Sequence, residues 1–154
     1  IENNISFGVK EFKSKEREKE RIIESASDAG LLEDIKGFEH GFETLLGERG
    51  VNLSGGQKQR ISIARALIRE PELLILDDCL SAVDVITEKH ILRRLKESHD
   101  MRSTLVVSHR ISTIKDADLI LVLDEGRIVE RGSHLELIKK GGLYAEMDQK
   151  QEGS

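Results

Sequence analysis

Apolar residues in the first seventy positions recur at the spacing of helix faces, and no stretch there reads convincingly as a strand. Residues 10–21 carry charges of both signs three or four positions apart, which predicts a solvated helix. From residue 22 the pattern becomes amphipathic until Gly30 stops it. The expected apolar face consists of Ile22, Ile23, Ala26 and Ala29. We therefore expect helices and loops before Pro71.

After Pro71 the pattern changes to continuous apolar runs, which are typical of buried strands in a parallel sheet. The expected strands are residues 73–76, 104–107, 118–124 and 127–131. Helices are expected at residues 87–98, with Ile91, Leu92 and Leu95 inward, and from His134 towards Lys140. Strands that alternate with helices predict an α/β fold with a mostly parallel sheet.

The stretch Leu53–Gln57, Leu-Ser-Gly-Gly-Gln, combines a helix start with two glycines that a helix disfavours. Ser54 and Gln57 fit the S-x-x-Q pattern of a capping box. Gly55 and Gly56 each cost a helix interior about 1 kcal/mol relative to alanine. They also expose backbone N–H groups that a phosphate can approach at the positive end of the helix dipole. A glycine-rich helix entry without a ligand has the same five residues, so the pentapeptide alone leaves both interpretations open.

Polar residues follow the first two expected strands. Asp77 and Asp78 come directly after the first, and His109 comes shortly after the second. Ligands of parallel sheets collect beyond the carboxyl ends of the strands, so these side chains are candidates for a site. Adjacent acids after a strand also cap helices or form turns, and a single histidine there is often an ordinary surface residue.

Taken together, Leu53–Gln57, the helix that Pro71 ends and the apolar strand with its terminal acids resemble an ABC ATPase. The segment Gly47–Gly50 and the closing stretch from Asp118 to Tyr144 are most similar to exporter ATPase domains. The resemblance implies a P-loop NTPase (RecA-like) fold that is incomplete here. Residues 1–70 would form the helical subdomain with the signature motif, and residues 71–154 the Walker B half of the core.

The resemblance also implies ATP and Mg²⁺ as cofactors and assigns a role to each candidate residue. Asp77 would hold Mg²⁺, Asp78 and His109 would be catalytic, and the D-loop, residues 81–84, would cross a domain interface. The residues expected to bind ATP are Ser54, Gly55, Gly56, Gln57 and Asp84. Asp78 departs from the usual glutamate by one methylene, and a displacement of about 1 Å can reduce a rate on the order of 10²-fold.

No G-x-x-x-x-G-K-[ST] phosphate loop occurs, and the chain does not begin with Met. We therefore expect a piece of a longer protein, inactive as an ATPase by itself. A net charge of −5 and 3% aromatic residues argue against a nucleic-acid partner. The single cysteine, Cys79, excludes an internal disulfide.

The partners implied by the resemblance are a second nucleotide-binding domain and a transmembrane domain, with this part on the cytoplasmic face of the cell membrane. Asp78 beside an intact signature favours a heterodimer in which this chain's own site is weak. One alternative is the carboxyl-terminal lobe of an SMC or DNA-repair ABC ATPase, with residues 10–21 as a coiled-coil end. That run lacks the apolar heptad of a coiled coil. A domain that binds ATP without hydrolysing it is the other alternative.

Overall fold

The computed structural model describes residues 1–47, 51–97 and 103–153, and these fall into two compact units, residues 1–107 and 108–154. Most of the segment Gly47–Gly50 and the expected helix end at Ser98 lie outside the described residues. The division expected at residue 70 concerns functional subdomains and stays a prediction. None of the described helices is long and apolar enough to cross a membrane.

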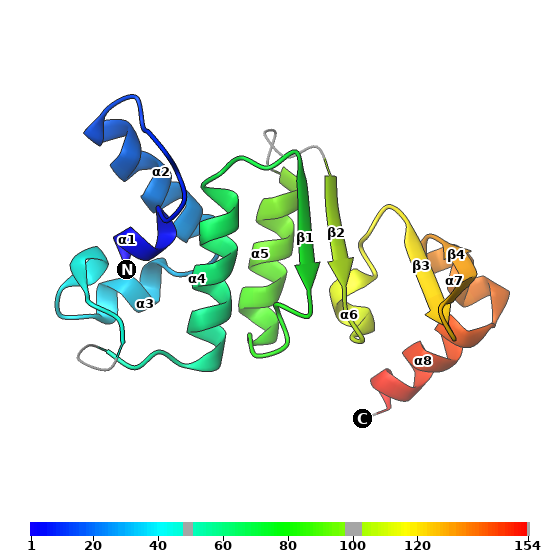
Figure 1. Cartoon of the computed structure of the whole chain (residues 1–154). Coiled ribbons are helices and arrows are strands. Elements are labelled where there is room, and N and C mark those ends of the chain that lie inside the picture. Colours follow the sequence, from blue (N-terminus) through cyan, green and yellow to red (C-terminus); the bar gives the residue numbers. More distant parts are fainter. Residues whose placement is uncertain (48–50, 98–102, 154) are drawn as a thin grey trace. The chain divides into compact units, whose positions relative to one another are not determined.

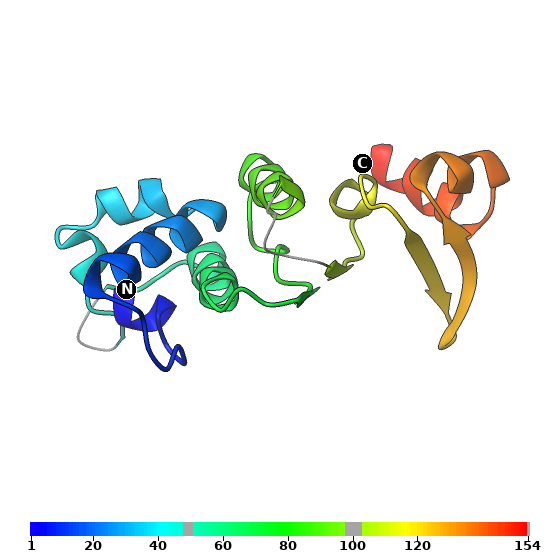
Figure 2. The same ribbon diagram turned by 90° about the horizontal axis from the view of Figure 1, so that it is seen from above.

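The first unit contains most of the helices and one pair of strands (Figure 1). Its elements are α1 (Glu2–Ile5), α2 (Lys15–Asp28), α3 (Leu32–Gly37), the 3₁₀ turn η1 (Gly41–Glu43), α4 (Gly55–Leu67), β1 (Leu73–Asp77), α5 (Val85–Glu97) and β2 (Ser103–Val107). Helices α1 and α2 pack against α4 (Figure 2). One core joins the helical part to the strands, because Ile22 of α2, Ala64 of α4, Leu74 of β1 and Ile91 of α5 belong to one buried cluster.

Helix α2 contains most of the charged run of residues 10–21 together with the amphipathic stretch that follows it. It begins at Lys15, where the hydroxyl of Ser14 accepts a hydrogen bond from the N–H of Arg17, and it continues through the amphipathic stretch. Ile22 and Ala26 are buried as expected, whereas Ile23 is 48% exposed, so its predicted inward position is wrong. Residues four apart, such as Ile22 and Ala26, share a helix face. Ile23 is adjacent to Ile22 in sequence, so its side chain points in a different direction around the helix axis.

Strands β1 and β2 form a parallel pair in which Leu73 lies opposite Ser103 and Asp77 opposite Val107. This confirms the predicted α/β class with a parallel sheet. Leu74 and Leu76 are buried, but Leu73 and Ile75 are 54% and 57% exposed, contrary to the expected burial. Parallel sheets normally need cover on both faces, and within the described residues one apolar face stays open.

The second unit is built around an antiparallel hairpin. Its elements are α6 (Ile111–Ile114), β3 (Ile120–Asp124), β4 (Arg127–Gly132), α7 (His134–Lys140) and α8 (Leu143–Glu152). Among the described residues, β3 and β4 form an antiparallel two-stranded sheet, so the parallel pairing described is that of β1 with β2. Their turn, Glu125-Gly126, has positive φ at both residues, as a two-residue hairpin of the right twist requires.

Candidate functional site

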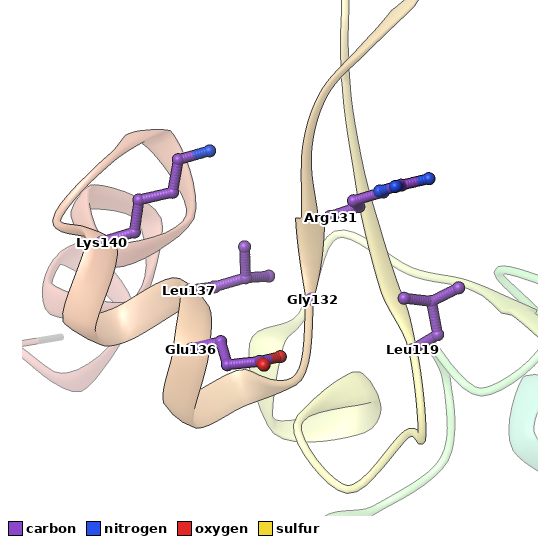
Figure 3. Close-up of a pocket in the computed structure, with 6 residues that line it drawn as sticks. All are labelled: Leu119, Arg131, Gly132, Glu136, Leu137 and Lys140. Atoms are coloured by element: carbon purple, nitrogen blue, oxygen red, sulfur yellow. The ribbon is translucent and has the colours of Figure 1, made fainter.

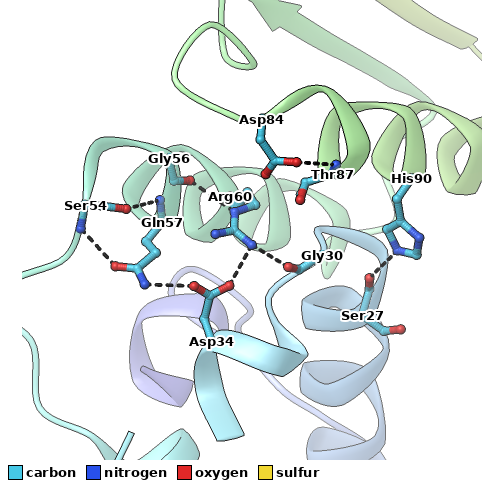
Figure 4. Close-up of polar contacts among 10 residues, drawn as sticks. All are labelled: Ser27, Gly30, Asp34, Ser54, Gly56, Gln57, Arg60, Asp84, Thr87 and His90. Atoms are coloured by element: carbon cyan, nitrogen blue, oxygen red, sulfur yellow. Dashed lines mark hydrogen bonds and ion pairs between the residues drawn. The ribbon is translucent and has the colours of Figure 1, made fainter. Parts of the chain in front are cut away.

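The signature turn, residues Ser54–Gln57, opens the 13-residue helix α4 with the predicted capping box (Figure 4). The Ser54 hydroxyl accepts a hydrogen bond from the N–H of Gln57 at 3.2 Å. The Gln57 side-chain carbonyl accepts one from the N–H of Ser54 at 2.9 Å. Ser54 and Gly55 are exposed, so an anion can approach the first turn of the helix.

The two glycines of this turn serve different purposes. A Cβ on Gly56 would lie 2.6 Å from the carbonyl oxygen of Ala82, which is closer than real Cβ contacts come. Gly56 therefore lets the start of α4 lie directly against the backbone of the D-loop. A Cβ on Gly55 would meet the Ala82 Cβ at an ordinary 3.6 Å. Packing against the D-loop thus requires a glycine at position 56 and does not require one at position 55.

A half-buried ion pair supports the turn, and no sequence pattern indicates it (Figure 4). The Gln57 amide nitrogen donates to Asp34 at 2.8 Å, and Arg60 donates to the other carboxylate oxygen of Asp34 at 2.7 Å. Arg60 also donates to the carbonyl oxygens of Gly30 and Gly56. Asp34 and Gly30 are far from Arg60 in sequence, so the pairing becomes visible only in the folded chain.

The D-loop is tied to α4 and caps the next helix. Gln59 donates to the hydroxyl of Ser81 and accepts from the N–H of Ala82 at 3.0 Å. The Asp84 carboxylate accepts from the N–H groups of Ile86 and Thr87, at the start of α5. The hydrogen bond from the Thr87 backbone is the main reason why the pKa of Asp84 lies below its usual value. Asp84 thus has a structural role besides its predicted contact with ATP.

Asp77 and Asp78 are both exposed at the carboxyl end of β1. Asp78 has φ +48°, a left-handed conformation that aspartate tolerates better than most side chains. Its N–H donates to Val107 at 3.0 Å, and its carbonyl oxygen accepts from the Ser81 hydroxyl at 2.9 Å. The backbone therefore connects the acids to the D-loop. Within residues 1–47, 51–97 and 103–153, no three potential metal ligands cluster.

His109 belongs to the second unit and is exposed there. Gln151 of α8 holds the backbone on both sides of it. The Gln151 amide donates to the His109 carbonyl oxygen at 2.7 Å and accepts from the N–H of Ile111 at 2.8 Å. No local pattern indicates this glutamine, since 42 residues separate it from His109.

The second unit also contains an open pocket of about 560 Å³ beside β4 and α7 (Figure 3). Its lining is Leu119, Arg131, Gly132, Glu136, Leu137 and Lys140. Glu136 accepts hydrogen bonds from the backbone and hydroxyl of Ser133, so this carboxylate caps α7. None of the predicted site residues lines the pocket.

Comparison with known proteins places these features in a family. The ABC transporter family matches residues 2–81. The ATP-dependent lipid A-core flippase of Alcanivorax borkumensis is 48% identical over 147 residues, which are 96% of this chain and 25% of the flippase. The probable multidrug resistance ABC transporter ATP-binding/permease protein YheI of Bacillus subtilis is 45% identical over 152 residues, 99% of this chain and 25% of that protein.

A solved structure agrees in fold as well as in sequence. The structure of a bacterial Atm1-family ABC exporter with ATP bound superposes with a TM-score of 0.86 at 42% identity, covering 97% of this chain and 26% of that one. The chain spans about a quarter of the length of these relatives. It belongs to the ABC transporter family and corresponds to an exporter-type ATP-binding segment.

Proposed function

We propose that this chain is the signature and Walker B part of the ATPase of an ABC exporter, and that its signature turn completes an ATP site on a second nucleotide-binding domain. ATP binding and hydrolysis at that interface would drive a transmembrane domain, with the ATPase on the cytoplasmic face of the membrane. The relatives support this assignment, because they include a lipid A-core flippase and a bacterial Atm1-family exporter with ATP bound.

The geometry of the signature turn is the observation that carries the proposal. Ser54 uses one lone pair to accept from the N–H of Gln57, so its hydroxyl hydrogen can still donate to a phosphate oxygen. The exposed first turn of α4 adds backbone N–H groups and the positive end of a helix dipole. A negatively charged phosphate therefore meets donors that are already in position.

The end of β1 would act on this chain's own ATP site. Mg²⁺, when bound, would neutralise charge on the phosphates. Mg²⁺ keeps several waters and takes one or two protein carboxylates, so the exposed Asp77 carboxylate fits that role without a larger cluster. Asp78 and His109 are the groups that would orient water and sense the terminal phosphate.

The two sites would be unequal in a heterodimer. Leu53–Gln57 is complete, whereas Asp78 is one methylene shorter than the family's usual glutamate. The left-handed backbone of Asp78 also suits a short polar side chain better than a longer one. The partner would therefore hold the more active site, and this chain would contribute its signature to it.

The packing of helix α2 argues against the alternative of an SMC or DNA-repair ATPase. That helix buries Ile22 and Ala26 in the core of the first unit and does not lead into a coiled coil within the described residues. The relatives are exporters as well.

The test is ATP hydrolysis by the full-length transporter that contains this chain. Ser54→Arg puts a bulky cation where the phosphate would approach, and we expect turnover to fall by about 100-fold or more. Ser62→Arg is the matched control, because Ser62 is exposed farther along the same helix. Similar activity in both variants would refute the proposal.

A further inference from the structure

We infer that Asp34 and Arg60 are positioning residues of the signature turn, acting through the side-chain amide of Gln57. Asp34, Arg60 and Gln57 together form the clamp. The inference rests on the proposed function, since it concerns how the turn is held ready for ATP. In this inference Gln57 fixes the shape of the turn through its hydrogen bonds to Ser54 and Asp34.

The ion pair of the clamp is mostly buried in the first unit, and the side chains of Gln57 and Arg60 both point to Asp34 (Figure 4). The side chain of Arg60 is 12% exposed and that of Asp34 is 21% exposed, and the nitrogen and oxygen of their ion pair are 2.7 Å apart. Arg60 also reaches the backbone of Gly30, where α2 gives way to α3, and of Gly56 in the turn itself. An ion pair in such a setting interacts more strongly than one in water.

The Asp34 carboxylate decides which way the Gln57 amide faces. A carboxylate can only accept hydrogen bonds, so the Gln57 nitrogen must point towards it. The Gln57 oxygen then points to the N–H of Ser54 and closes the capping box. Arg60 in turn holds Asp34 through the second carboxylate oxygen. The order of action runs from Arg60 through Asp34 and Gln57 to Ser54.

This arrangement makes a charge-dependent prediction at Gln57. Gln57→Glu keeps an oxygen for the Ser54 N–H, but it sets a second carboxylate against Asp34 at hydrogen-bond distance. Two like charges that close oppose each other strongly. Asp34→Asn has the converse defect: if its oxygen faces Arg60, its nitrogen faces the nitrogen of Gln57. In the double variant the new amide at position 34 can donate to the new carboxylate at position 57, while its oxygen accepts from Arg60.

The structure also offers a matched control for the loss of an ion pair. Arg94 of α5 donates to Asp28 of α2 at 2.8 Å, and the Asp28 side chain is 18% exposed. None of the contacts described for this pair involves the signature turn. Asp28→Asn therefore removes a comparable charge from the same unit without disturbing the clamp.

The experiment measures kcat and KM for ATP in the full-length transporter, together with the midpoint of thermal unfolding. We expect kcat to fall about fivefold in Asp34→Asn and about tenfold in Gln57→Glu, and to return to within about threefold in the double variant, as coupled neighbours do. Asp28→Asn should lower the unfolding midpoint by a similar amount to Asp34→Asn while kcat stays within about twofold, since distant sites act independently.

Two results would overturn the inference. One is a double variant whose loss is the product of the two single losses, which would show that the residues do not act through each other. The other is an equal fall of kcat in Asp34→Asn and Asp28→Asn, which would reduce the clamp to general stability. Ser54→Arg in the same preparation tests the proposed function separately: full activity in that variant would refute it whatever the clamp variants do.

Discussion

The start of α4 and the end of β1 are the two places in the first unit where this chain would meet ATP, and they are held in different ways. At α4, side chains set the geometry: Ser54 and Gln57 cap each other, and Asp34 and Arg60 brace them. At β1, backbone hydrogen bonds contribute: the N–H of Asp78 donates to the Val107 carbonyl oxygen, and the N–H of Ser81 donates to the Asp78 carbonyl oxygen. A turn that its own side chains fix is in position before a ligand binds.

Disabling each of the two places in turn tests the difference between them most directly. In the full-length complex we expect Asp78→Asn to reduce ATP turnover less than about twofold, against the loss of about 100-fold in Ser54→Arg. The reason is that, in the proposed heterodimer, Asp78 would serve the weaker site, while Ser54 would serve the partner's site. Steady-state hydrolysis of both variants under the same conditions measures the difference.

Asp78→Glu provides the converse substitution. It restores the missing methylene, and its turnover should equal or exceed that of the unsubstituted complex. Near-complete inactivation by Asp78→Asn would show that Asp78 is a working catalytic acid and would remove the argument for unequal sites.

The two glycines of the signature turn allow close packing and access to a ligand to be tested separately. Gly56→Ala must push the D-loop away from α4, because its Cβ would come too close to the Ala82 oxygen. We expect a loss of stability of about 1–3 kcal/mol, as overpacking causes. Thermal unfolding of the protein, followed by an ATPase assay, measures the effect.

Gly55→Ala is the control for that substitution. Its Cβ meets only ordinary contact, and alanine is the better helix former, so stability should be unchanged or slightly higher. If Gly55→Ala keeps the fold but lowers ATP turnover, the exposed glycine serves the ligand. Equal destabilisation by both substitutions would contradict the close approach seen at Gly56.

The smallest expected effect concerns Asp84 and acid. Hydrogen bonds to its carboxylate lower the pKa of Asp84 below the usual 3.8. A lowered pKa means that the charged cap stabilises the fold above that value, and that this contribution is lost as the pH falls through the pKa of the folded state. Asp84→Asn keeps a capping side chain without the charge. Between about pH 5 and about pH 3, the unsubstituted protein should lose slightly more stability than this variant, as thermal unfolding at each pH measures. Parallel losses would show that Asp84 is not titrating as a cap.

Local features of the fold were predictable from the sequence, and distant contacts were not. The capping box joins Ser54 to Gln57, three residues away, so the sequence pattern predicts it. The strand ending at Asp77 was visible as an apolar run, yet its exposed face was not, because such a run indicates a strand without saying what covers it. Asp34 and Gln151 act on partners 23 and 42 residues away, and only the folded chain brings them together.

Gln59 couples the position of helix α4 to that of the D-loop. A single amide binds both the hydroxyl of Ser81 and the N–H of Ala82, so it forms a strut between α4 and the D-loop. In the proposed dimer, α4 serves the partner's nucleotide while the D-loop spans the interface next to this chain's own acids. Each hydrogen bond contributes about 0.5–1.5 kcal/mol, enough to make the two parts move together in small displacements and separate in large ones. The strut would therefore transmit a small shift at one nucleotide to the other site within a single chain, and its rupture would mark the point at which the two sites begin to move independently.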